Sequence, residues 1–266
     1  MSFFPILPFG GLQGWQFLMR TLPRQTEAFE KSTVNQREVE YFSEVIFSID
    51  SAEELVSDRR ALSFALTAFG LEGDLDNKFL IKKILEEGTL SPESLANKFS
   101  DKRYYELSKA FGFGPLEATR TGSSEFVNRI IVQYEENAFR AAVGAQDATM
   151  RLAISFNDDV KEIINSSTTN NARWLAVLGN PPVKKVIETA LRIPSGSINQ
   201  GIDQQIETLK DRLESLSGSD DLLSIFDDEV SEKLVRNFLL FDGGGFTRST
   251  GSQNALTLLR GAKSSV

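Results

Sequence analysis

Carboxylate side chains are the main groups in this sequence that could carry out chemistry. The chain of 266 residues contains neither histidine nor cysteine. This excludes imidazole and thiol catalysis, disulfides, and zinc or iron–sulfur sites built from these residues. Three adjacent aspartate pairs remain: 158–159, 220–221 and 227–228. Each pair lies at or near a predicted helix end, and adjacent residues point to different faces of a helix. We therefore interpret the pairs as caps and surface charge, because two catalytic carboxylates must face one substrate.

Metal and phosphate motifs are incomplete. Asp74, Asp76 and Asn77 resemble the start of a calcium loop, but the twelfth residue counted from Asp74 is Leu85, where a glutamate is needed. The glycines 243–245 are not followed by the lysine and hydroxyl residue of a phosphate loop. We therefore predict no catalytic residue, no cofactor and no metal, and a protein that is not an enzyme.

One alternative to a non-enzymatic protein stays open. It is a small-molecule-binding domain, or an enzyme of unknown substrate, that uses carboxylates or the tyrosines Tyr104 and Tyr105 between helices. A polar pocket lined by unpaired acids would favour this alternative.

A short helical unit recurs along the chain. Residues 57–71 begin with Ser-Asp, which favours a helix start, continue with apolar residues at helical spacing and end at Gly70, which favours a helix stop. Residues 100–113 repeat this pattern and end at Gly112, and residues 180–193 resemble a worn third copy. We interpret the unit as scaffold, with Phe69 and Phe111 in the core.

The remaining pattern predicts an all-α fold: a multi-helical array of short capped helices with internal helical repeats, plus longer amphipathic helices. Ser51–Glu54 has the spacing of a capping box, and residues 77–87 present Phe79, Leu80, Ile84 and Leu85 on one predicted core face. The predicted organisation has five parts: an apolar N-terminal arm at 1–22, a helical repeat region at 23–113, a loop at 114–124, a second helical region at 125–241 packed on the first, and a flexible tail at 242–266.

Composition limits the partners. Hydrophobic residues make up 41% of the chain and the formal net charge is −8, so the chain can bury a core but has no basic stretch for nucleic acid or anionic membranes. No apolar run approaches the roughly 20 residues of a membrane span, and the N-terminus lacks the pattern of a secretory signal. We expect a cytoplasmic or flagellum-associated protein.

The two termini are the candidate binding sites, because both are apolar. The partner would contact Phe3, Phe4, Leu7 and Trp15 in the arm, and Leu256, Leu258 and Leu259 in the tail. The alternative is that either end packs on its own domain.

Several blocks of the sequence resemble the bacterial domain-of-unknown-function family 1217. The blocks that carry the resemblance are Ala52–Leu71, Asn77–Gly88, Ser94–Tyr104, Trp174–Pro182, Glu188–Leu191 and Asp203–Gln205. The resemblance implies a helical fold without an assigned activity, and members are often encoded beside flagellar structural genes. The expected function is a non-enzymatic interaction or assembly factor whose protein partner is a flagellar component.

Overall fold

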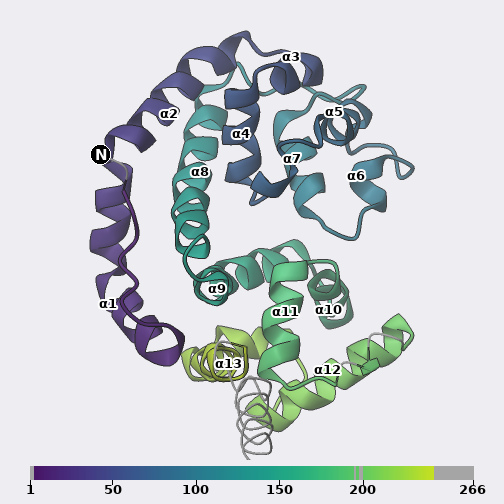
Figure 1. Cartoon of the computed structure of the whole chain (residues 1–266). Helices are drawn as coiled ribbons and strands as arrows, with labels where there is room; N and C mark the ends of the chain where they lie inside the picture. The colour runs from purple at the N-terminus through teal and green to yellow at the C-terminus, as the bar shows by residue number, and fades with distance from the viewer. Residues whose placement is uncertain (1–2, 195, 198–199, 243–266) are drawn as a thin grey trace, which may run out of the picture.

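The structure is a computed structural model that describes residues 3–194, 196–197 and 200–242. These residues form the thirteen α-helices α1 to α13 and several short 3-10 helices, with no strand among them, which confirms the predicted all-α class. No helix in the described part of the chain is long and apolar enough to cross a membrane. The helices gather in two lobes connected by one long helix (Figure 1).

The N-terminal lobe surrounds one apolar core. Phe64 lies in this core and stacks between Phe42 and Tyr134, with ring-centroid distances of 4.1 and 3.6 Å. Its helices are α2 (Thr33–Val45), α3 (Ala52–Ser57), α4 (Arg59–Ala68), α5 (Lys78–Glu87), α6 (Leu95–Lys98) and α7 (Arg103–Phe111), with 3-10 turns at Ile46–Ser48 and Glu72–Asp74.

The C-terminal lobe surrounds a second core, which contains the fully buried Trp174. Helix α1 (Gly11–Glu30) belongs to this lobe through Leu18, although it begins the chain. The other helices are α9 (Ala148–Ser166), α10 (Asn170–Leu178), α11 (Pro181–Ala190), α12 (Ile202–Ser217) and α13 (Asp228–Phe241), with a 3-10 turn at Leu222–Phe226.

Helix α8 (Ser124–Gly144) belongs to both lobes. Its first half contributes Phe126 and Ile130 to the N-terminal core, and its second half contributes Phe139 and Val143 to the C-terminal core. A single helix therefore contributes side chains to both cores. The domain division at residues 114–124 stays a prediction.

The predicted unit at residues 57–71 forms the helix ends that its sequence predicts. Asp58 Oδ1 accepts hydrogen bonds from two N–H groups in the first turn of α4, both at 2.9 Å. At the other end Gly70 has a φ of +66°, and the N–H of Leu71 donates to the C=O of Leu66 at 2.8 Å. Gly112 also has a φ of +66°. Both glycines thus adopt the left-handed conformation that ends a helix.

Residues 180–193, the predicted third copy, end in the same way without a glycine. Arg192, after α11, has a φ of +54°, and the N–H of Ile193 donates to the C=O of Glu188 at 2.8 Å. This conformation is disfavoured for a residue with a Cβ by about 1–2 kcal/mol. The shared ends describe local geometry, and the internal repeat itself stays a prediction.

Of the predicted core residues, Phe79 lies outside the core and Phe69 lies at its edge. Phe79 is 80% exposed, because α5 turns the face with Ile81 and Leu85 inward. Phe69 is only half-buried because it follows the last turn of α4 at the edge of a cleft, whereas Phe111 is fully buried as predicted.

Candidate functional site

The N-terminal segment 3–10 folds back along α1 (Figure 1). Gln25, a buried residue of α1, holds it in place. Its Oε1 accepts a hydrogen bond from the N–H of Ile6 at 2.7 Å, and its Nε2 donates to the C=O of Ile6 at 3.2 Å. The side-chain amide of Gln146 donates to the C=O of Pro5 at 2.7 Å. Two consecutive residues of the segment are therefore attached to the helical body.

Three of the residues predicted to bind a partner face this body. Phe3, Leu7 and Trp15 are partly buried and pack against the C-terminal core. The ring of Phe3 contacts Phe29 and Phe139, with centroid distances of 5.7 and 6.3 Å. These three side chains attach the arm to its own domain, as the alternative interpretation of the sequence expects. Their role in partner binding stays a prediction.

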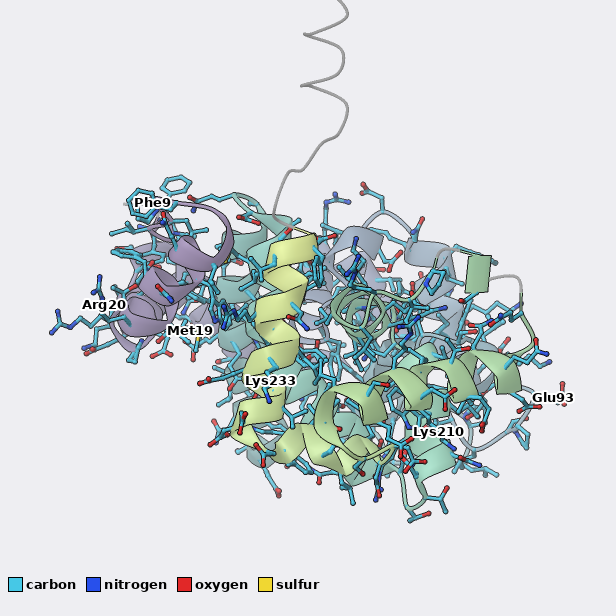
Figure 2. All side chains as sticks on the ribbon, turned by 90° about the horizontal axis from the view of Figure 1, so that it is seen from below. Phe9, Met19, Arg20, Glu93, Lys210 and Lys233 are labelled. Carbon is cyan, nitrogen blue, oxygen red and sulfur yellow. The ribbon has the colours of Figure 1, made fainter. Side chains whose placement is uncertain are left out.

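The other side of the segment is apolar and open. Phe4, Ile6 and Phe9 are 74%, 61% and 59% exposed, and we call these three residues the apolar strip. Figure 2 shows Phe9 on the same flank of the molecule as Met19 and Arg20 of α1. Exposed apolar residues that cluster on one face are typical of an interaction site.

Only Phe4 of the strip is among the predicted binding residues. Because neighbouring side chains of an extended segment point to opposite sides, Phe3 and Leu7 facing inward place Phe4 and Ile6 outward. That alternation is the signal that would have found Ile6. The predicted tail residues Leu256, Leu258 and Leu259 lie outside the described residues.

A second candidate site is a cleft of about 470 Å³ between the two lobes. Helix α8 joins the lobes on one side of it. On another side Gly179, after α10, lies so close to the chain before α7 that a Cβ at this position would be 2.6 Å from the carbonyl oxygen of Ser100. The lobes therefore approach each other in two places, and the cleft remains between these places.

The walls of the cleft are the charged faces of three helices. Seven lining residues are basic and five are acidic, although acidic residues outnumber basic ones by 37 to 29 in the whole chain. On α8 the lining residues recur at helical spacing: Arg129, Gln133, Glu136, Asn137 and Arg140. The charged residues from α7 are Arg103, Glu106 and Lys109, with Lys102 just before this helix. Those from α9 are Arg151, Asp158, Asp159 and Glu162.

Some of these charges are paired within the protein. The pairs are Arg103–Asp101 and Arg140–Asp158, both at 2.6 Å, and Arg151–Glu72. The last pair connects α9 with the 3-10 turn after α4, so it crosses from one lobe to the other.

Two carboxyl groups on α9 that line the cleft have raised pKa values. Burial raises the pKa of Asp159 to about 6, and nearby Arg140 only partly offsets this effect. Burial also raises the pKa of Glu162, and the negative charge of Glu106 on the opposite wall adds to the shift. Strongly shifted acids in a cleft are typical of functional sites but also occur in structural clusters.

The cleft corrects one sequence interpretation. Asp158 and Asp159 lie in the middle of α9 rather than near a helix end. By contrast, Asp221 and Asp227 do cap helices, because their carboxylates accept hydrogen bonds from the N–H groups of Leu223 and Glu229. No group of three or more acidic residues in the described part of the chain is arranged to hold a metal ion.

Comparison with known proteins identifies a family and a fold. The family model with the description "Protein of unknown function (DUF1217)" matches residues 68–229. A crystal structure of protein AGR_C_984 from Agrobacterium tumefaciens is similar with a TM-score of 0.68 and 23% sequence identity, and the match covers 90% of this chain and 97% of that chain. No protein with a curated description matches the sequence. At this identity the crystal structure supports the fold alone.

Proposed function

The chain belongs to the DUF1217 family of proteins of unknown function, and from this premise we propose that it is a non-enzymatic interaction or assembly factor that binds a protein of the bacterial flagellum. The binding surface in this proposal is the apolar strip. The choice of a flagellar partner rests on the family resemblance. The choice of binding surface rests on the exposed apolar residues of segment 3–10.

The observation that carries the proposal is the attachment of Ile6 to Gln25. This pair of hydrogen bonds fixes the backbone while Phe4 and Ile6 point to solvent. A segment that is already ordered loses little conformational entropy when a partner binds, so more of the contact energy becomes affinity. Aromatic side chains are also enriched among the residues that dominate binding energy.

A second function, binding of a small molecule, is favoured by a different observation. The charged cleft contains two carboxyl groups with raised pKa values, Asp159 and Glu162. This function does not exclude the first, because the cleft and the apolar strip share no residue.

The interaction proposal is tested by co-sedimentation of the purified full chain with isolated flagellar filaments and hook–basal bodies. A triple variant with serine at positions 4, 6 and 9 is compared with Phe79→Ser. Phe79 is the control because it is a phenylalanine at least as exposed as those of the strip and lies on α5, in the other lobe. We expect the triple variant to bind about 30-fold more weakly, which corresponds to about 2 kcal/mol, and the control to bind like wild type.

Deletion of residues 1–22 is not a suitable test. It would remove the fully buried Leu18 and the partly buried Trp15 along with the strip, so lost binding could reflect lost folding. Binding that is the same for wild type, triple variant and control would reject the strip as the site. Absence of wild-type sedimentation with every flagellar fraction would reject the flagellar partner.

A further inference from the structure

The cleft between the lobes contains positive charges that the protein does not neutralise. Arg120 and Arg129 line it, and neither has a carboxylate partner within ion-pair distance among the described residues. The guanidinium of Arg129 only lies near the ring of Phe126, at 5.9 Å from its centroid. Arginine presents several N–H donors in a planar arrangement that matches carboxylate and phosphate groups.

The cleft also contains acceptors without a donor. Gln133 lines the cleft on α8, and its Oε1 is inaccessible to solvent and has no hydrogen-bond partner in the described part of the protein. Asp159 and Glu162 on α9 also lack a hydrogen bond or an ion pair to any described residue. The Gln133 acceptor is buried without a donor, which is unfavourable, whereas the carboxylates of Asp159 and Glu162 are reached by solvent and can pair with a ligand that brings N–H donors.

The free arginines and the free carboxylates of α9 lie toward opposite ends of the cleft, and one further cation, Lys109, lies near Glu162. Arg129 and Arg140 are eleven residues apart on α8, which places them about 16 Å apart along the helix axis. Arg140 is paired with Asp158, the neighbour of Asp159. The end of the cleft near Arg140 is therefore the end with the free carboxylates, and Arg129 lies toward the other end.

We infer that the cleft binds a small zwitterion of the amino-acid type, whose anionic group pairs with Arg129 and Arg120 and whose ammonium group pairs with Asp159 and Glu162. Gln133 lies between these ends on α8 and lines the cleft there. The volume of about 470 Å³ is within the usual range for small-molecule sites.

Ligands with a single charge fit the cleft less well. An anion alone would be repelled by the carboxylates of Asp159, Glu162 and Glu106, and a cation alone would be repelled by the free arginines. A ligand with both charges several ångströms apart pairs with both ends and leaves the net charge of the cleft unchanged.

Three probes of equal chain length test the inference on the full chain. The probes are 6-aminohexanoate, which carries both charges, hexanoate, which carries only the negative one, and hexylamine, which carries only the positive one. Isothermal titration calorimetry at neutral pH should show binding of 6-aminohexanoate with a dissociation constant below about 10 mM. Hexanoate and hexylamine should each bind at least about tenfold more weakly, because each leaves one charged end unpaired.

Substitutions at each end then identify the contacts. Arg129→Gln and Asp159→Asn should each weaken 6-aminohexanoate about tenfold, and Arg192→Gln, outside the cleft, should leave it unchanged. Arg129 is exposed, so its replacement does not endanger folding. Arg129→Glu should make hexylamine the better ligand. Equal affinity for 6-aminohexanoate and hexanoate, no effect of either substitution, or no binding of any probe would each overturn the inference.

Discussion

Gln25 pairs with both backbone groups of Ile6 through one side-chain amide, with N–H···Oε1 at 2.7 Å and Nε2–H···O=C at 3.2 Å. The same Nε2 also donates to Thr21 Oγ1 at 2.8 Å. A single side chain thus takes the place of a neighbouring strand for the extended segment 3–10. The exposed position of the apolar strip depends on this pair.

Gln25→Ala should release the segment from α1. The variant loses three hydrogen bonds, of which the two to the segment can be replaced by water once it lifts, so we expect unfolding free energy to fall by about 1–2 kcal/mol. Limited proteolysis should cut within residues 3–10 much faster than in wild type. Gln16→Ala, at an exposed position of the same helix, is the control. Equal cleavage of both variants would show that the packing of Phe3 and Leu7 alone holds the segment.

Arg192→Gly should stabilise the protein. Glycine adopts the φ of +54° at this position without the Cβ penalty of about 1–2 kcal/mol. The substitution also removes the contact between the Arg192 guanidinium and the ring of Phe241, at 5.1 Å, worth about 0.5–1 kcal/mol. We expect a net gain of about 0.5–1 kcal/mol in urea unfolding. A loss of stability would show that the side chain of Arg192 stabilises the protein by more than its contact with Phe241.

Gly112→Ala should destabilise more than Gly70→Ala, although both glycines have a φ of +66°. A Cβ at Gly112 would be 2.4 Å from the carbonyl oxygen of Ala118, whereas a Cβ at Gly70 would be 3.5 Å from Arg103 Nη1. The backbone penalty of about 1–2 kcal/mol is common to both variants, so the steric overlap makes the difference. Thermal unfolding of the two variants in parallel measures it, and equal melting temperatures would contradict the close approach.

Phenylalanine-to-alanine substitutions should rank by burial. Phe111→Ala should cost about 3–5 kcal/mol because it empties a fully buried aromatic site. Half-buried Phe69 should cost less, about 1–2 kcal/mol, since less apolar area is lost. Phe79→Ala should change stability by less than about 0.5 kcal/mol. Urea unfolding checks the order, and a large cost at Phe79 would mean that α5 packs through its other face.

Asp159→Asn should stabilise the protein at neutral pH and have little effect near pH 4. The folded pKa of Asp159, about 6, lies above the ordinary value of 3.8, so the native state binds more protons than the unfolded state between these values. Stability supplied by protonated Asp159 is therefore full below pH 4 and is lost as pH rises through 6. Asparagine at this position stays neutral at every pH, so the variant does not lose this stability as the pH rises.

We expect the difference between this variant and wild type to reach at least about 1 kcal/mol at pH 7–8 in urea unfolding. The charged groups that face Asp159 are Arg140, Glu162, Asp158 and Arg103. They are the same in both proteins, so the difference isolates Asp159. A difference that does not change between pH 5 and pH 8 would contradict the raised pKa. Together with weaker binding of 6-aminohexanoate, the gain in stability would show a carboxylate kept for binding at a cost to folding.

The local features of this protein can be read from its sequence. The composition shows directly that histidine and cysteine are absent. The helices, the cap at Asp58 and the glycine ends at 70 and 112 depend on residues within a few positions of one another. A side-chain oxygen two residues from an N–H, or a glycine after the last helical turn, acts whatever packs against the helix.

Only the tertiary structure decides which faces are covered. The sequence places Phe79 and Leu85 on one apolar face, but the neighbouring helices bury Leu85 and leave Phe79 in solvent. It offers Phe3 and Phe4 as equal candidates, but Gln25, more than fifteen positions away, holds the segment so that one is inside and the other outside. Asp159 resembles surface charge until α7 and α8 enclose it. Burial and charge pairing depend on segments far apart in the chain, and no pattern within one helix specifies which segments will meet.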